Sequence, residues 1–368
     1  MKTRKLITAL GALAFAATSA LAPHAEAGVT VKPHALQKLF DSYGNAGTGD
    51  RWTGGPLMGA VKLPDGRTAF SFGFTYLGKV NKNGSRDAST KRVNNSWVIQ
   101  EKNGKLSKTL TGAGGTDFYP APSPQTFYEP AGAVVSGSKL YQLLFIRGYA
   151  DSPDTMTPTL HADVATISLP GFTLDGIAHT NLLNTNTVQT GEQVYPVEWG
   201  SAAINDGGYT LVWGIEQTEF GFFAHLARLP IGQMTANPEY WDGAAWGPVP
   251  ARSARVFGGG SNGYTHLTAT KFPGGVRLIT QGYPAGASFH DIYAFTATTA
   301  TGPYKTAYVT TMKVPGADGT LANRYWPSEV SSLGTAKTAV IAYLMDGGGA
   351  ERTNNVANYR PVWLQANF

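Results

Sequence analysis

Three glutamates stand at similar distances from recurring turns in this chain, and they offer the carboxyl groups that acid–base chemistry requires. Glu129 and Glu198 lie eight residues before their turns, and Glu329 lies seven before its own. Counting back eight residues from the two other turns of this kind gives His266 and Met58. Neighbouring carboxyl groups can act as acid and base or nucleophile at an anomeric carbon, because close like charges raise the pKa of one of them. We predict Glu198 and Glu329 as a catalytic pair, with Glu129 orienting or tuning them.

Aromatic residues flank these glutamates, as is typical of sugar-binding sites. Ring faces can pack against the apolar faces of sugars. We therefore expect substrate contacts from a group of five residues: Tyr128, Trp199, Tyr264, His266 and Trp326. A structural role is an equal alternative, because hydrogen-bond and ion-pair networks also use such glutamates to hold neighbouring strands together.

The elements that must position these residues are strands, and they recur. Five turns separate a strand-like run of small residues from a bulkier run. The turn residues Gly66, Gly137, Asp206, Gly274 and Ala336 lie 71, 69, 68 and 62 residues apart. Repeats of this length, small on the first strand and bulky on the next, fit the blades of a β-propeller, where inner strands crowd an axis.

We therefore predict an all-β protein with a single five-bladed β-propeller domain over residues 49–368. Residues 28–48 form an N-terminal segment in which residues 35–40 could make one short helix. Two fused β-sandwiches are the alternative architecture, since they also consist of repeated antiparallel strands. In a propeller the starts of the inner strands converge, which would bring the predicted site residues to the mouth of the central channel.

The first 27 residues predict a secretory signal peptide. A basic start is followed by an apolar run over residues 6–21 and by Ala25-Glu26-Ala27, a small-x-small cleavage site. Cleavage there would leave 341 residues and lower the net charge from +5 to +3, because Lys2, Arg4, Lys5 and Glu26 are lost. We expect an extracellular protein that is not membrane-bound after cleavage, since no other stretch is apolar for 18 residues.

The composition excludes several function classes. Only 14% of residues are charged and none is cysteine, which removes disulfides, thiolate nucleophiles and cysteine-bound metals. Lysine and arginine are scattered, so nucleic acid is not an expected partner. We expect a monomeric protein that binds a glycan and has no organic cofactor. A structural cation in the central channel is left open.

Several segments resemble secreted bacterial five-bladed propellers of the glycoside hydrolase type, a group that includes arabinanases and endo-D-arabinanases. The segments are residues 63–78, 94–98, 227–230, 240–246 and 302–304. The resemblance implies carbohydrate hydrolysis by acidic residues in the channel mouth. The family opening usually reads Phe-Gly-Asp-Thr, and here Phe74 replaces the aspartate. Either catalysis has passed to Glu129, Glu198 and Glu329, or this member binds glycan without cleaving it.

Overall fold

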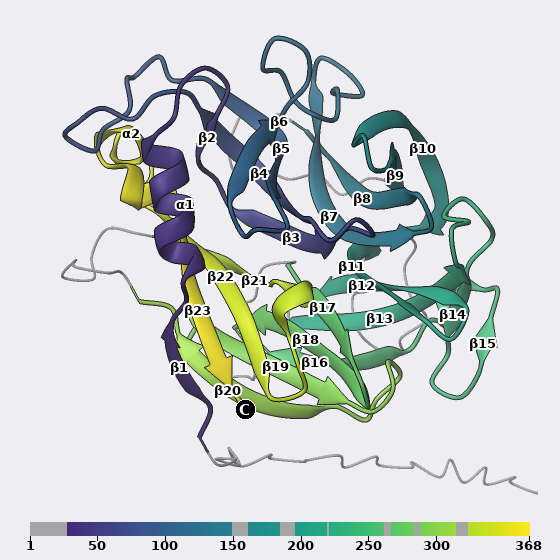
Figure 1. The fold of residues 1–368 in the computed structure, drawn as a ribbon. Coiled ribbons are helices and arrows are strands. Elements are labelled where there is room, and N and C mark those ends of the chain that lie inside the picture. The colour runs from purple at the N-terminus through teal and green to yellow at the C-terminus, as the bar shows by residue number, and fades with distance from the viewer. Residues whose placement is uncertain are drawn as a thin grey trace, which may run out of the picture.

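The fold was obtained as a computed structural model that describes residues 28–148, 161–184, 196–218, 221–260, 266–282, 288–313 and 323–368. Its strands form five antiparallel sheets arranged in a ring (Figure 1). The first sheet contains β3 (Leu57–Lys62), β4 (Thr68–Leu77), β5 (Arg92–Gln100) and β6 (Leu106–Leu110), with β2 (Trp52–Gly54) beside the end of β4. The second contains β7 (Thr126–Ser136), β8 (Lys139–Gly148), β9 (His161–Ser168) and β10 (Thr173–Leu183).

The other three sheets repeat this order from the axis outward. The third contains β11 (Val197–Asp206), β12 (Tyr209–Thr218), β13 (Gly221–Pro230), β14 (Glu239–Trp241) and β15 (Trp246–Gly247), with β16 (Arg255–Gly260) beside β13. The fourth contains β17 (Thr268–Phe272), β18 (Gly275–Gln281), β19 (Asp291–Ala297) and β20 (Lys305–Thr311). The fifth contains β21 (Asn323–Glu329), β22 (Thr338–Asp346), β23 (Pro361–Asn367) and β1 (Thr30–Pro33).

The five inner strands close the ring. Each contacts the next, from β3 through β7, β11 and β17 to β21, and β21 contacts β3 again. The prediction of a five-bladed β-propeller is confirmed, and the alternative of two fused sandwiches is wrong. The inner strands need small residues because they approach closely: a Cβ atom on Gly132 would lie 2.7 Å from the backbone of Ala202 on the neighbouring blade.

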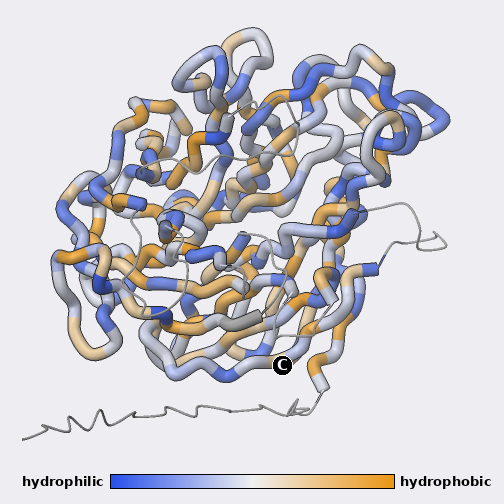
Figure 2. Tube along the Cα trace, turned by 180° about the vertical axis from the view of Figure 1, so that it is seen from behind, coloured by the Kyte–Doolittle hydropathy of each residue, from blue (hydrophilic) through white to orange (hydrophobic). Residues whose placement is uncertain are grey.

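The core is divided among the seams between blades. Five clusters of buried residues each draw on two neighbouring sheets. Large rings such as Phe70, Trp97 and Trp213 are fully buried there, and burying each stabilises the fold by roughly 2–3 kcal/mol. Hydrophobic residues accordingly recur along the strands in Figure 2, whereas hydrophilic residues gather in the outer loops.

The N-terminal segment belongs to the ring. Strand β1, which the sequence did not predict, pairs with β23 from Thr30 opposite Asn367 to Pro33 opposite Leu364. Helix α1 (Leu36–Asn45) is longer than predicted, and its Phe40 ring stacks on Trp363 at 4.8 Å. Short helical turns also occur at α2 (Glu351–Asn354), η1 (Pro250–Arg252), η2 (Ser331–Leu333) and η3 (Val356–Tyr359). No helix among the described residues has the length and apolar character needed to span a membrane.

Candidate active site at the start of the inner strands

Glu129 and Glu198 meet at one arginine. Arg147, near the end of β8, donates from Nε to Glu129 Oε2 at 2.7 Å and from Nη2 to Glu198 Oε2 at 3.1 Å. Its Nη1 also donates to Glu198 Oε1. All three side chains are buried. We call this group the shared-arginine cluster, because one cation joins acids from two neighbouring inner strands.

The shared-arginine cluster contains two carboxyl groups but only one cation. Burial raises the pKa of Glu129, and the charge of Glu198 raises it further, whereas Arg147 acts in the opposite direction without cancelling the shift. Burial alone would lower the pKa of Arg147, but the two glutamates raise it above its ordinary value. Arg147 therefore stays charged, and Glu129 is the member of the cluster best suited to hold a proton.

An aromatic group lies beside this cluster. The ring of Phe74 stacks on Trp326 with centroids 6.0 Å apart and meets Phe127 edge to face at 5.5 Å. Phe127 is the cross-strand partner of Arg147, which places the rings next to the acids. Phe74 and Trp326 have φ angles of 37° and 59°, a left-handed conformation that costs about 1–3 kcal/mol in a residue other than glycine. Such strain is concentrated at functional sites.

The structure corrects the predicted equivalence of Glu329 with the other two glutamates. Strands β7 and β11 each contain a register shift, after which Ala133 and Ala202 resume pairing, and Glu129 and Glu198 lie four residues before these points. In β21 the same shift ends at Ser328, and Glu329 follows it. Glu329 therefore lies at a different level of the channel.

At that level Glu329 pairs with Arg277 of β18 instead. Arg277 donates from Nε to Glu329 Oε2 at 3.0 Å, and from Nη2 to the other carboxylate oxygen. The remaining donors of Arg277 reach the carbonyl oxygens of Thr335 and Thr338 at 2.9 and 2.8 Å. Burial raises the pKa of Glu329, although Arg277 opposes the shift. We call this group the channel pair, and every donor in it is used for holding strands together.

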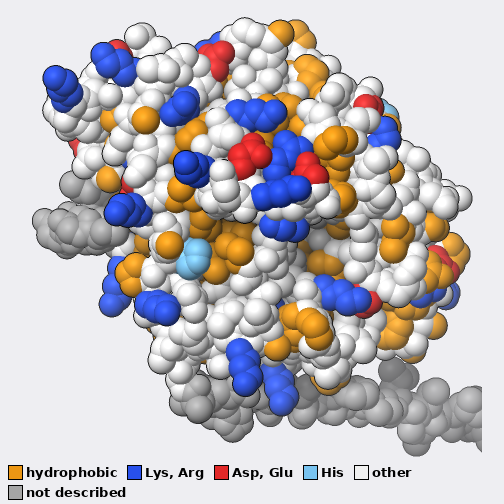
Figure 3. Space-filling model, viewed as in Figure 1, with side chains coloured by type: hydrophobic (Ala, Val, Ile, Leu, Met, Phe, Trp, Pro, Cys, Tyr) orange, Lys and Arg blue, Asp and Glu red, His pale blue; other side chains and the backbone are white. Residues whose placement is uncertain are grey.

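The channel pair lies beside a hollow of about 250 Å³ on the axis. Residues from all five inner strands line this hollow, among them Lys62, Val135, Asn205, Lys271 and Glu329. The lining extends from residues beside the hairpin turns to Ala131 and Ser201, which follow Glu129 and Glu198 by two and three residues. In Figure 3, basic and acidic side chains lie side by side over the first two blades rather than forming a patch of one sign.

The other predicted substrate contacts are placed differently by the structure. Trp199 is 1% exposed and packs on Tyr240 with centroids 5.2 Å apart, so it belongs to the core rather than to a sugar platform. Tyr128 is buried and donates its hydroxyl to Asp163 at 2.7 Å. Trp199 and Tyr128 therefore lie in the core. Trp326 is buried as well, with 8% exposed, and stays a candidate through its stack with the half-buried ring of Phe74.

The two remaining candidates are His266 and Tyr264. His266 is buried, and its Nε2 lies 2.7 Å from the hydroxyl of Ser328. Burial lowers the pKa of His266 to about 4, so the ring is neutral at pH 7. Tyr264 lies outside the described residues. His266 is therefore held by a neighbouring blade rather than directed at the shared-arginine cluster.

Sequence reasoning missed the cations of both groups. Arg147 and Arg277 lie on second strands that are mostly apolar, and a charged residue within such a run was the available signal. A fourth buried glutamate, Glu216 of β12, was also missed. Burial alone would raise its pKa, but His225 at 3.2 Å and Arg255 at 2.7 Å outweigh this effect and lower the pKa to about 2. Glu216 is therefore ionised and held in blade three.

Comparison with solved structures finds proteins of similar fold, and glycoside hydrolases are among them. A solved protein from Bacteroides ovatus, provisionally described as a hydrolase, aligns with a TM-score of 0.69 and 15% identity over 94% of this chain and 93% of its own. An α-L-arabinofuranosidase from Podospora anserina aligns with a TM-score of 0.48 and 12% identity, over 88% of this chain and 93% of its own. A family 117 glycoside hydrolase from Zobellia galactanivorans aligns with a TM-score of 0.46 and 11% identity, over 92% and 90%.

The sequence itself defines the family more directly. Residues 37–367 match a family described as "Domain of unknown function (DUF5005)", and the chain belongs to that family. No curated protein sequence matches the chain. At the identities of the solved neighbours the likeness concerns the fold, and the chemistry has to be argued from the site.

Proposed function

We propose that this protein is a glycoside hydrolase that acts on a polysaccharide at the end of the channel where the inner strands begin. The observation that carries the proposal is the shared-arginine cluster, in which two glutamates from adjoining blades converge on Arg147 beside a stack of aromatic rings. Glycoside hydrolysis needs two carboxyl groups with unequal proton affinities and an apolar surface for the sugar.

The two glutamates take different roles in this proposal. Glu129, whose pKa is raised, holds the proton and gives it to the glycosidic oxygen that leaves. Glu198 accepts two hydrogen bonds from Arg147 and serves as the carboxylate. It either takes a proton from the attacking water or itself attacks the anomeric carbon, with water then releasing the sugar. The half-buried ring of Phe74, supported by Trp326 beneath it, offers a surface to the sugar, and Glu329 has a structural role in the channel pair.

We infer an extracellular location and a plant or cell-wall polysaccharide as substrate. The N-terminal leader pattern supports export, and the resemblance to arabinanase-type propellers makes arabinan the first substrate to test. The replacement of the usual aspartate by Phe74 means that this chain would use a different set of acids from the pattern that it resembles.

A second function, glycan binding without cleavage, is favoured by one specific observation. Both glutamates are hydrogen-bonded to Arg147 while Phe74 fills the place of the usual acid. In that case the half-buried ring of Phe74, backed by the buried rings of Phe127 and Trp326, would form the binding platform. The cluster would only hold blades two and three together.

Product release from a polysaccharide panel separates the two functions. We expect the purified protein to release reducing ends from one panel member. Glu198→Gln and Glu129→Gln should each lower kcat by about 10²–10⁴-fold while glycan affinity stays the same. Glu329→Gln is the matched control and should leave kcat unchanged. Glycan binding with no turnover by the unaltered protein would instead establish the binding function, and equal kcat for Glu198→Gln and the unaltered protein would exclude this site.

A further inference from the structure

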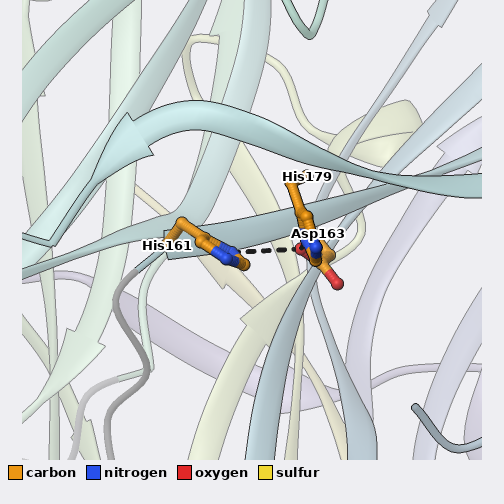
Figure 4. Close-up of side chains that lie close together, drawn as sticks. All are labelled: His161, Asp163 and His179. Atoms are coloured by element: carbon orange, nitrogen blue, oxygen red, sulfur yellow. Dashed lines mark hydrogen bonds and ion pairs between the residues drawn. The ribbon is translucent and has the colours of Figure 1, made fainter.

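A separate group of side chains in blade two has the composition of a metal site. His161 and Asp163 lie two residues apart on β9, so their side chains project from the same face of the strand. His179 of β10 is the direct cross-strand partner of Asp163. Figure 4 shows the two imidazole rings converging on the carboxylate. Three potential ligands from two adjacent strands are thus brought together by register alone.

The donor atoms are already close to one another. Asp163 Oδ1 lies 2.6 Å from Nδ1 of His179 and 3.2 Å from Nδ1 of His161. All three ligand atoms lie within 4.8 Å of one another. Around a tetrahedral Zn²⁺ with bonds of about 2.0–2.1 Å, ligand atoms are separated by roughly 3.3 Å. Changes of up to about 1.5 Å in the separations of the ligand atoms would therefore accommodate the ion.

The Asp163 carboxylate is oriented by a hydrogen bond, as metal-binding carboxylates usually are. Asp163 is 1% exposed, and its second oxygen, Oδ2, accepts the Tyr128 hydroxyl at 2.7 Å. Oδ1 is thereby left to face the two histidines. Outer-shell hydrogen bonds of this kind orient first-shell ligands and raise metal affinity. The exposed fraction of the His179 side chain is 70% and that of His161 is 26%, so an ion can reach the group from solvent.

We propose that His161, Asp163 and His179 bind a divalent transition-metal ion, with Zn²⁺ as the best match. Two imidazole nitrogens and one carboxylate oxygen suit Zn²⁺ and disfavour Ca²⁺ and Mg²⁺, which prefer oxygen ligands. Three protein ligands leave a fourth position for water. The ion would join β9 to β10 and fix Asp163 and Tyr128, the residue that precedes Glu129 in β7. The site is independent of the proposed hydrolase function.

Direct titration tests this site. Protein without a polyhistidine tag is stripped with EDTA and titrated with Zn²⁺ by calorimetry, and with Co²⁺, whose visible spectrum reports tetrahedral coordination. We expect one ion per chain and a rise in the melting temperature when the ion is bound. His179→Gln should lower affinity by about 100-fold, and Tyr128→Phe by about 10-fold through the lost outer-shell bond.

Matched controls make the result decisive. His34→Gln changes another histidine, one that lies outside the cluster, and should bind Zn²⁺ as the unaltered protein does. Because His179 is exposed, His179→Gln should fold even if substitution of buried Asp163 prevents folding. Failure of the unaltered protein to bind Zn²⁺ at about 10 μM, or equal affinity in His179→Gln, would overturn the proposal.

Discussion

Two buried arginines hold glutamates in this propeller, but Arg147 serves two acids whereas Arg277 serves one. In the channel pair, the single positive charge matches a single carboxylate, and backbone carbonyls take the remaining donors. In the shared-arginine cluster, two carboxylates compete for one cation. Burial raises the pKa of both Glu129 and Glu329, but only Glu129 has a second carboxylate, Glu198, that raises it further. The channel pair therefore matches its charges, whereas the shared-arginine cluster has one carboxyl group in excess.

The difference shows how to separate a structural ion pair from a candidate catalytic one. A buried ion pair with matched charges can often be replaced by apolar residues at little cost in stability. The presence of such a pair therefore does not by itself indicate a function. A buried carboxyl group without a cation of its own destabilises the fold, and packing does not require it. Titratable groups that are perturbed in this way are concentrated at functional sites. This criterion favours Glu129 and Glu198 over Glu329, although all three are buried glutamates on inner strands.

Removing each cation should give the largest effect and the clearest contrast. Arg147→Met leaves two adjacent buried acids, whereas Arg277→Met leaves one, so the first should destabilise more. Breaking a buried pair costs about 3–5 kcal/mol, and we expect Arg147→Met at or above this range at pH 7. Denaturant unfolding measures both free energies. An equal or larger cost for Arg277→Met would remove the distinction between the two groups.

The same variant has a pH signature. The pKa of Glu129 is already raised by burial, and Arg147 opposes this shift. Without Arg147 the pKa of Glu129 should rise further above its unfolded value, so the folded state binds a proton more tightly. Stability of Arg147→Met should therefore increase as pH falls from 7 towards 5, relative to the unaltered protein. A parallel pH dependence in both proteins would contradict the unequal charge balance.

The channel side should respond to acid through His266, which bonds to Ser328, the neighbour of Glu329. Its pKa is lowered from 6.5 to about 4 by burial, so the unfolded chain binds a proton that the folded chain excludes. Stability should fall by roughly 3 kcal/mol as pH decreases from about 6.5 to about 4. His266→Gln should lose most of this dependence. The free energy of unfolding of both proteins is measured across this pH range. An equal decrease in the two proteins would refute the assignment.

Packing around the channel pair should tolerate no added atom. A Cβ on Gly334 would lie 2.4 Å from Glu329 Oε1 and 3.1 Å from Arg277 Nη2. We expect Gly334→Ala to destabilise by about 1–3 kcal/mol, measured by thermal unfolding. Gly247→Ala is the control, because its added Cβ would meet nothing within 4 Å. Equal effects of the two substitutions would show that the channel pair is loosely packed.

The aromatic group should give the smallest effect. Phe74→Ala removes one ring from the stack with Trp326 and should weaken glycan binding by about 1 kcal/mol, or roughly fivefold. Calorimetric titration with a bound oligosaccharide measures the change. Tyr308→Ala, on the exposed outer strand of blade four, is the control and should leave affinity unaltered. Unchanged affinity in Phe74→Ala would place the sugar elsewhere.

Local patterns were enough to predict the propeller, because each hairpin carries its own turn and its own contrast between small and bulky strands. They also counted Glu129 and Glu198 to equivalent positions, since β7 and β11 each contain a register shift that ends four residues after the glutamate. Glu329 was misaligned because the last hairpin has the short helix η2 between its strands, and counting from the turn cannot detect that difference.

Contacts between distant segments could not be predicted in this way. The bonds of Arg147 to Glu198 and of Asp163 to His179 join residues whose proximity depends on the ring or on the register of an outer strand. Likewise, nothing local to residues 30–33 indicates that their partner is the last strand of the chain. Sequence spacing identified which residues could do chemistry, but the fold decided which of them meet.

The pairing of β1 with β23 has a consequence for how the ring assembles. A side-chain hydrogen bond there joins Asn367 to Thr30 across 337 residues, and no disulfide holds the two ends together because the chain contains no cysteine. Closing a loop of that length costs roughly 5 kcal/mol of chain entropy. Blade five is therefore the blade that can form only after the rest of the chain is available. A covalent link between β1 and β23 would close this loop in the unfolded chain, so folding would no longer carry its entropy cost. The blades on the opposite side of the ring would not be affected.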